Sequence, residues 1–75
     1  MKRVVLYTKS KCSHCVSAKK YLDQQNIKYR LCDVSVQPGK KEFGKTGLLS
    51  VPALKVGDMI LKGFSIESFD ALYND

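Results

Sequence analysis

The alternation of apolar and polar residues divides the chain into seven short segments of predicted regular structure. A continuous apolar run in residues 2–8 predicts a strand buried on both faces, because a strand with one solvated face would alternate. In residues 13–25, Cys15, Ala18 and Leu22 share one stripe while lysines occupy other positions. This spacing predicts an amphipathic helix whose apolar stripe faces the core.

A second strand follows this helix. Asn26 is typical of a helix C-terminus, where a left-handed backbone conformation is common. Residues 27–33 alternate apolar with basic side chains, and Ile27, Tyr29 and Leu31 form the apolar face. Because a helix connects the two strands, we expect them to be parallel and joined by a right-handed crossover.

The second half of the chain predicts a short helix and a hairpin. Residues 38–46 begin with proline and contain glycine, so we expect a short, distorted helix anchored by Phe43. Residues 51–56 and 59–61 are mainly apolar and predict two strands. The Gly-Asp pair at 57–58 between them predicts the turn of the hairpin.

A last helix completes the predicted order. Residues 65–73 carry apolar side chains at helical spacing, with Ser65 as the expected N-cap and Glu67 supplying negative charge in the first turn. The order is therefore strand, helix, strand, helix, strand, strand, helix (βαβαββα). It predicts an α/β fold in which helices cover a four-stranded mixed sheet.

Length and charge narrow the class of protein. The chain has 75 residues, and this length predicts one domain with a small core. Its net charge is +6. Its lysines are scattered and no known nucleic-acid motif is present, so we expect no nucleic-acid partner. No apolar run approaches membrane-spanning length, and the start of the chain does not resemble a signal peptide. We therefore expect a cytoplasmic protein that keeps its cysteines reduced for reactivity or metal binding.

The pair Cys12-x-x-Cys15 carries the candidate chemistry. Cys12 follows the first predicted strand and opens the first predicted helix. At a helix N-terminus, free backbone N–H groups and the helix dipole favour negative charge, so a thiolate there should form readily. Cys15 lies close enough on the first turn to close a disulfide with Cys12. The hypothesis is a dithiol–disulfide exchange site, and the alternatives are a metal or cluster carrier that also uses Cys32, or a basic docking module.

Four markers in order extend this hypothesis across nearly the whole chain. They are Val5-Leu6-Tyr7-Thr8-Lys9 before Cys12-Ser13-His14-Cys15, then Ser50-Val51-Pro52, Gly57-Asp58 and Gly63-Phe64. Together they resemble the glutaredoxins of the thioredoxin superfamily. The resemblance implies that residues 1–75 form a single glutaredoxin-like domain with a thioredoxin-like (glutaredoxin) fold and a cis peptide bond before Pro52.

Two departures from the family pattern concern what the cysteines react with. Glutaredoxins commonly have Cys-Pro-Tyr-Cys, whereas Ser13 and His14 occupy the middle here. The family's Gly-Gly is followed by polar residues that hold the γ-glutamyl end of glutathione, and here Phe64-Ser65-Ile66 replaces most of them. Lys62-Gly63-Phe64 is instead similar to the small glutaredoxin-like electron donors of ribonucleotide reductase, which take electrons from thioredoxin reductase.

The resemblance implies a thiol–disulfide oxidoreductase that serves electron transport and cell redox homeostasis. Cys12 would be the nucleophile and Cys15 the resolving thiol. The implied substrate- or glutathione-binding residues are Lys9, Ser13, His14, Val51, Pro52, Gly63, Phe64 and Ser65. We expect no bound cofactor or metal, with glutathione or a thioredoxin-reductase-type flavoprotein as electron donor. The expected partners are disulfide-containing proteins, ribonucleotide reductase among the candidates, and the expected state is a monomer.

Three residues keep two interpretations each at this point. His14 either stabilises the Cys12 thiolate as a cationic imidazole or is a solvent-facing spacer. Phe64 either contacts substrate in a groove or packs in the core under the last helix. Cys32 is either a partly buried structural thiol or a regulatory one.

Overall fold

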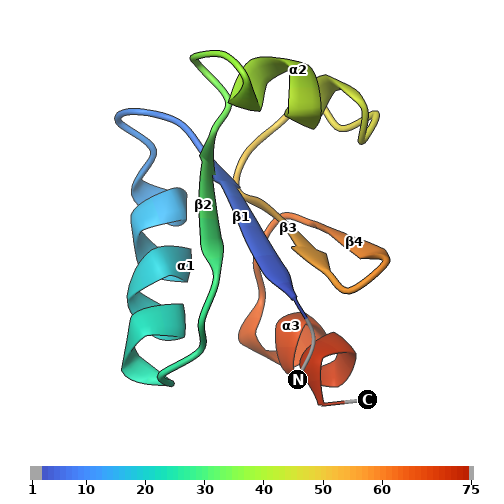
Figure 1. Cartoon of the computed structure of the whole chain (residues 1–75). Coiled ribbons are helices and arrows are strands. Elements are labelled where there is room, and N and C mark those ends of the chain that lie inside the picture. The colour runs from blue at the N-terminus through green and yellow to red at the C-terminus, as the bar shows by residue number, and fades with distance from the viewer. Residues whose placement is uncertain (1–2, 75) are drawn as a thin grey trace.

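Four strands form one mixed sheet in the order β2-β1-β3-β4 in the computed structural model, which describes residues 3–74 (Figure 1). The elements are β1 (Val4–Thr8), α1 (Ser13–Gln24), β2 (Arg30–Asp33), α2 (Gly39–Gly44), β3 (Ala53–Val56), β4 (Met59–Lys62) and α3 (Ile66–Tyr73). Strand β1 pairs in parallel with β2 and antiparallel with β3, and β3 pairs antiparallel with β4. The predicted fold class and element order are confirmed; the predicted start of the first strand at residue 2 lies outside the described residues.

The larger core lies between one face of the sheet and the helices α1 and α3. Its buried members are Val4, Leu6, Ala18, Leu22, Leu54, Val56 and Phe69. Val4 and Leu6 alternate along β1 and so point to the same face. The apolar stripe predicted for α1 is confirmed, because Cys15, Ala18 and Leu22 are its buried residues.

A smaller core on the opposite face explains the continuous apolar run of β1. Tyr7 points away from Leu6 and packs with Cys32 and Ala53 beneath α2. The ring centroid of Phe43 in α2 lies 5.4 Å from that of Tyr7, so Phe43 is the anchor that the sequence predicted. Helix α2 lies at the end of the sheet where β1 leads into the loop before α1 (Figure 1).

The predicted apolar face of the second strand is confirmed for Ile27 and Tyr29, which pack against the larger core, but it is wrong for Leu31. Leu31 is 48% exposed, whereas its neighbour Cys32 is 3% exposed, and the strand begins at Arg30 rather than Ile27. The reason is that β2 is an edge strand, so only the side chain that faces α2 is covered. Ile27 instead completes the end of α1: its N–H donates to the carbonyl of Leu22 at 3.0 Å.

The close approach of α2 to the end of β2 depends on Gly39. An added Cβ atom there would lie 2.0 Å from the carbonyl oxygen of Asp33 and 3.2 Å from Cys32 Sγ. Gly39 is the first residue of α2, and Pro38 is its N-cap. The Gln37–Pro38 peptide bond is cis. The helix is short, as predicted, and Gly39 allows it to dock against the end of β2.

Among residues 3–74, no helix has both the length and the apolar character that crossing a bilayer requires.

Candidate redox site

Cys12 is the N-cap residue of α1. Its backbone is extended (φ −107°, ψ 104°), and its Sγ accepts a hydrogen bond from the backbone N–H of Cys15 at 3.3 Å. A sulfur in this position takes the place of the oxygen that normally caps a helix and receives one of the unpaired N–H groups. The structure therefore places Cys12 where the sequence predicted it, partly exposed and facing the positive end of the helix dipole.

The surroundings of Cys12 lower its thiol pKa. The largest cause is a hydrogen bond from the Cys15 thiol, and backbone N–H groups of Cys15 and His14 add to it. The positive charge of Lys9 acts in the same direction, while the little burial that Cys12 has opposes it. His14 itself is exposed and contributes through its backbone N–H.

The surroundings of Cys15 have the opposite effect. Burial is the main cause that raises its pKa, and its hydrogen bond to Cys12 raises it further. The Thr8 side chain and the backbone of Lys9 partly offset this through hydrogen bonds that lower the pKa. The two thiols are therefore unlike: Cys12 is accessible and forms a thiolate more readily, whereas Cys15 is 2% exposed and retains its proton.

Strand register brings the Val51–Pro52 segment to the same end of the sheet. Tyr7 pairs with Ala53, so Pro52 lies beside the end of β1, from which the loop to Cys12 departs. The Val51–Pro52 peptide bond is cis, as the resemblance implied, and Pro52 is buried. Strand β3 begins at Ala53, two residues later than predicted.

Gly63, which follows β4, lies at the same end of the sheet. Ala53 pairs with Lys62, so Gly63 follows directly beside Pro52. Its φ of +77° lies in the left-handed region that favours glycine. The sheet thus gathers the Cys12 loop, the Val51–Pro52 segment and Gly63 from three parts of the sequence.

Phe64 and Ser65 have structural roles. The Phe64 ring is half-buried and lies 5.7 Å from the ring of Tyr21 and 6.2 Å from that of Phe69, measured between centroids. This packing favours the core interpretation of Phe64. Ser65 is the N-cap of α3, as predicted, and its Oγ accepts the Ser68 N–H at 3.5 Å.

Ser13 and Lys9 lie at the solvent edge of the site. Ser13 is the first residue of α1 and is exposed, like Lys9 in the preceding loop. In that loop, Lys11 adopts a left-handed backbone conformation with φ 61°. The side chains around Cys12 are therefore exposed, and Cys12 itself is partly exposed.

A family model decides the classification of the chain. The model of the glutaredoxin family matches residues 4–60. The chain belongs to the glutaredoxin family. Glutaredoxin 1 of Rickettsia conorii is 33% identical over 64 residues, which cover 80% of this chain and 63% of that protein. The chain therefore matches less than two thirds of the length of this relative.

Solved structures support the same fold for this glutaredoxin-family chain. A mutant of a thioredoxin-like protein superimposes with a TM-score of 0.89 at 26% identity, covering 99% of this chain and 97% of the other. The glutaredoxin-like protein NrdH-redoxin from Escherichia coli superimposes with a TM-score of 0.79 at 22% identity and covers 93% of each chain. The first match covers nearly the whole of both chains.

Cys32 lies apart from the paired cysteines in this glutaredoxin fold. It is buried under α2, and its Sγ lies 3.6 Å from Glu42 Oε2. Burial and the Glu42 charge raise its pKa. Within residues 3–74, no group of three or more His, Cys, Asp or Glu side chains is arranged to hold a metal ion.

Sequence reasoning missed one group that acts on the cysteine pair. Thr8 ends β1, and its side chain hydrogen-bonds with Cys15. The available signal was its position as the last residue of the strand before Lys9. A hydroxyl there is well placed to meet the first turn of the helix that returns along the sheet.

Proposed function

We propose that this glutaredoxin-family protein is a thiol–disulfide oxidoreductase that reduces protein disulfides or glutathione mixed disulfides through Cys12 and Cys15. The observation that carries the proposal is the opposite direction of the two pKa shifts at one helix N-terminus. An accessible thiolate attacks, and a neighbouring buried thiol keeps its proton until it is needed.

The proposed reaction has two exchange steps. The Cys12 thiolate attacks one sulfur of the substrate disulfide, a mixed disulfide forms, and the other substrate sulfur leaves as a thiolate that takes a proton. Cys15 then loses its proton and attacks Cys12 Sγ, which forms the Cys12–Cys15 disulfide and releases the second substrate thiol. Two electrons pass from the dithiol to the substrate, so the two cysteines need no bound cofactor or metal for these steps.

The resolving step is supported by the hydrogen bond between the two thiols. In the reduced pair, the Cys15 thiol donates toward Cys12 and stabilises its thiolate. Once Cys12 is bonded to substrate, it carries no charge, so the Coulombic effect of Cys12 that raises the Cys15 pKa is lost. Cys15 then ionises more readily when its attack is required.

Substrate would lie along the Val51–Pro52 segment and Gly63. The family role of this segment is to pair its backbone with an extended peptide or glutathione, and its place beside the Cys12 loop supports that role here. Ser13 and His14 on the first turn, with Lys9 in the loop, would line the other side. The proposed partners are disulfide-containing proteins, ribonucleotide reductase included. We propose that the protein acts on them as a monomer in the cytoplasm.

The proposed electron donor is a thioredoxin-reductase-type flavoprotein, with glutathione as the alternative. Phe64 packs against Tyr21 and Phe69, and Ser65 caps α3, so both side chains are engaged where the family holds glutathione. NrdH-redoxin, a glutaredoxin-like protein whose structure resembles this one, has a thioredoxin-like activity profile. Two electrons from the donor would restore the Cys12–Cys15 dithiol.

The test is reduction of a protein disulfide with two reductant systems. We expect turnover with NADPH and thioredoxin reductase that exceeds turnover with glutathione and glutathione reductase. Cys12→Ser should abolish turnover, Cys15→Ser should accumulate a mixed disulfide visible by mass spectrometry, and Cys32→Ala is the matched control that should retain activity. Full activity of Cys12→Ser would refute the dithiol mechanism, and faster turnover with glutathione would refute the donor assignment.

A further inference from the structure

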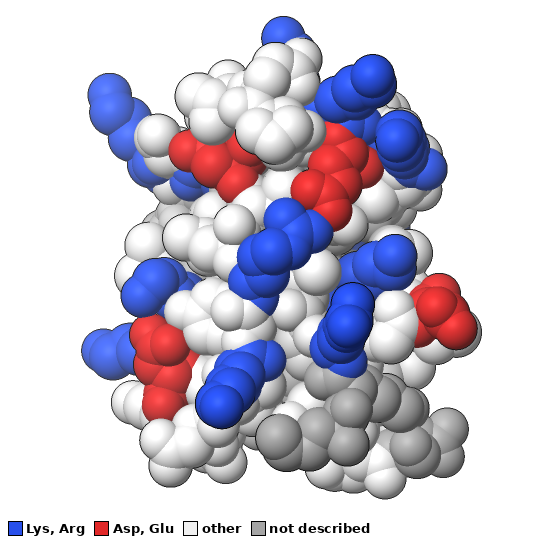
Figure 2. Space-filling view, in the orientation of Figure 1, with Lys and Arg blue, Asp and Glu red and all other residues white. Residues whose placement is uncertain are grey.

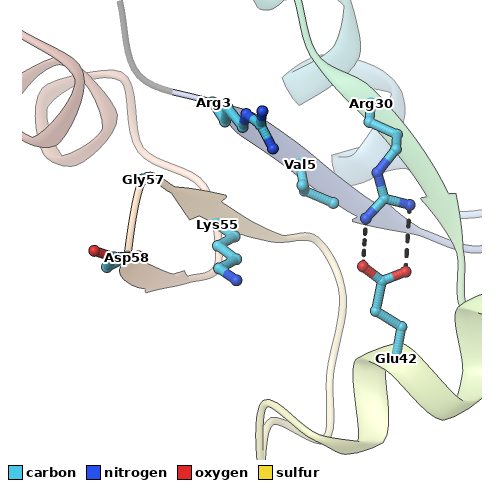
Figure 3. A pocket seen from close by; sticks show the side chains of 7 residues that line it. All are labelled: Arg3, Val5, Arg30, Glu42, Lys55, Gly57 and Asp58. Atoms are coloured by element: carbon cyan, nitrogen blue, oxygen red, sulfur yellow. Dashed lines mark hydrogen bonds and ion pairs between the residues drawn. The ribbon is translucent and has the colours of Figure 1, made fainter.

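The sheet face that α2 covers is left open beyond that short helix. A cavity of about 310 Å³ lies in this open part (Figure 3). It is lined by Arg3, Val5, Arg30, Glu42, Lys55, Gly57 and Asp58. Val5 and Lys55 are register partners on β1 and β3, so they mark its floor on the sheet itself. A volume near 300 Å³ is the lower end of the range for small-molecule sites.

The charges around this cavity are not balanced. Both terminal nitrogens of the Arg30 guanidinium contact the Glu42 carboxylate, so these two residues neutralise each other. The side chains of Arg3 and Lys55 form no hydrogen bond or ion pair with the described residues. The Asp58 carboxylate is the other acidic group, and Figure 3 shows it pointing away from the cavity. Two cations therefore remain available.

The wider surface agrees with this imbalance. Figure 2 shows more basic than acidic side chains on the face that it displays. The hydrogen bond from Arg30 is the main cause that lowers the pKa of Glu42, and the charge of Lys55 adds a smaller effect in the same direction. The Lys55 ammonium group therefore lies within electrostatic reach of the Arg30–Glu42 pair. An anion that enters would meet Lys55 from β3, Arg3 from the residue just before β1, and the Arg30–Glu42 pair at the rim of the cavity.

We propose that this cavity binds a phosphate group carried by a small molecule. A guanidinium and an ammonium group together give a phosphate several charge-assisted hydrogen bonds, with Arg supplying the forked geometry. A second cavity of about 350 Å³ shares Glu42, Lys55 and Asp58 with the first and extends to Tyr7, Thr46 and Ile60. It offers an aromatic ring and an apolar side chain to the organic part of the ligand.

This site is separate from the cysteine pair. Lys55 pairs with Val5, whereas the Cys12 loop departs after Thr8, three residues further along β1. The helix that carries Cys12 and Cys15 packs on the opposite face of the sheet. Phosphate binding therefore does not depend on the proposed disulfide chemistry, and each can fail alone.

The test is a titration of the 15N-labelled protein with inorganic phosphate, monitored by amide chemical shifts, against sodium chloride at equal ionic strength. We expect saturable shifts at Arg3, Val5, Lys55 and Gly57 with phosphate only. The double variant R3Q/K55Q should raise the phosphate Kd at least about tenfold. The matched control is K20Q, which removes an exposed lysine from α1 and should leave the Kd unchanged.

A nucleoside monophosphate is the second probe. We expect it to bind at least about tenfold more tightly than inorganic phosphate and to shift Tyr7 and Ile60 as well. Shifts that do not saturate, shifts that chloride reproduces, or an unchanged Kd in R3Q/K55Q would overturn the phosphate site. Saturable shifts centred on Cys12 to Cys15 would place the anion at the helix N-terminus and also overturn it. Equal affinity for the two probes would overturn the role of the second cavity.

Discussion

Replacing Gly39 with alanine tests whether the docking of α2 on β2 requires a residue without a side chain. The new Cβ atom would lie 2.0 Å from the carbonyl oxygen of Asp33. Contacts of a Cβ atom under 3.0 Å are essentially never seen, so the two backbones must separate by at least 1.0 Å (3.0 − 2.0). The added Cβ atom is fixed to the backbone of α2, and the oxygen that it meets belongs to the backbone of β2. No flexible side chain can therefore move to relieve the clash.

The expected loss of stability has two sources, the close contact itself and the movement of α2 away from the sheet. Overpacking a close contact costs about 1–3 kcal/mol, and movement of α2 would also loosen Phe43 from the small core around Tyr7 and Cys32. We expect a loss of about 3 kcal/mol in the free energy of unfolding. In a domain of this size 1 kcal/mol corresponds to about 4–8 °C, so Tm should fall by roughly 12–24 °C.

Gly44→Ala is the matched control at the other end of the same helix. An added Cβ atom there has no neighbour within 4 Å, so alanine should be neutral or stabilise by up to about 1 kcal/mol. Urea unfolding followed by circular dichroism, with thermal melts in parallel, gives both values. A loss below about 1 kcal/mol for Gly39→Ala, or equal losses for the two variants, would refute the close-approach argument.

Three further changes test other parts of the structure. Asn26→Ala should cost about 1–2 kcal/mol because φ is +57° there, whereas Asn26→Gly should be near neutral; equal unfolding energies in urea would contradict this. Because the Cys12 pKa is lowered, its alkylation by iodoacetamide should rise at a lower pH than that of an ordinary thiol. Lys9→Gln should move this rise to higher pH and Lys11→Gln should not, since the Lys9 charge is among the causes of the shift; equal profiles would remove Lys9 from the site. Phe69→Ala should cost about 3–5 kcal/mol in urea unfolding, and a loss under about 1 kcal/mol would show that the α3 core is loosely packed.

Besides the order of the elements, several features that the sequence predicted correctly are local ones. Asn26 ends α1 in the left-handed conformation and Ser65 caps α3, because these side chains stabilise a helix end through groups a few residues away. Cys12 belongs with them: a sulfur before a helix-forming segment meets the free N–H groups wherever that helix packs. Such features can be recognised in the sequence without knowledge of the tertiary structure.

The features that it missed depend on neighbours distant in sequence. Leu31 alternates as a buried strand residue should, yet its exposure follows from the place of β2 at the sheet edge. The glycines of residues 38–46 predicted only a short, distorted helix, and the contact with Asp33 shows why Gly39 is required there. Periodicity identifies the face of an element, but it does not say which faces another element will cover.

The redox site depends on both local and long-range features. Its local properties can be inferred from the sequence, whereas its long-range ones require the packed structure. The lowered pKa of Cys12 arises within one helical turn and from Lys9, so a sequence containing this turn already predicts it. The raised pKa of Cys15 comes chiefly from burial, which exists only once α1 has packed on the sheet. Residues on that packed surface, such as Thr8, therefore change the pKa of the resolving thiol separately from that of the nucleophile.

Thr8→Val should raise the Cys15 pKa further and slow resolution of the mixed disulfide, while alkylation of Cys12 keeps its pH profile. Quenched-flow trapping of the mixed disulfide measures the first effect, and an unchanged resolution rate would show that the Thr8 hydroxyl has no part in it.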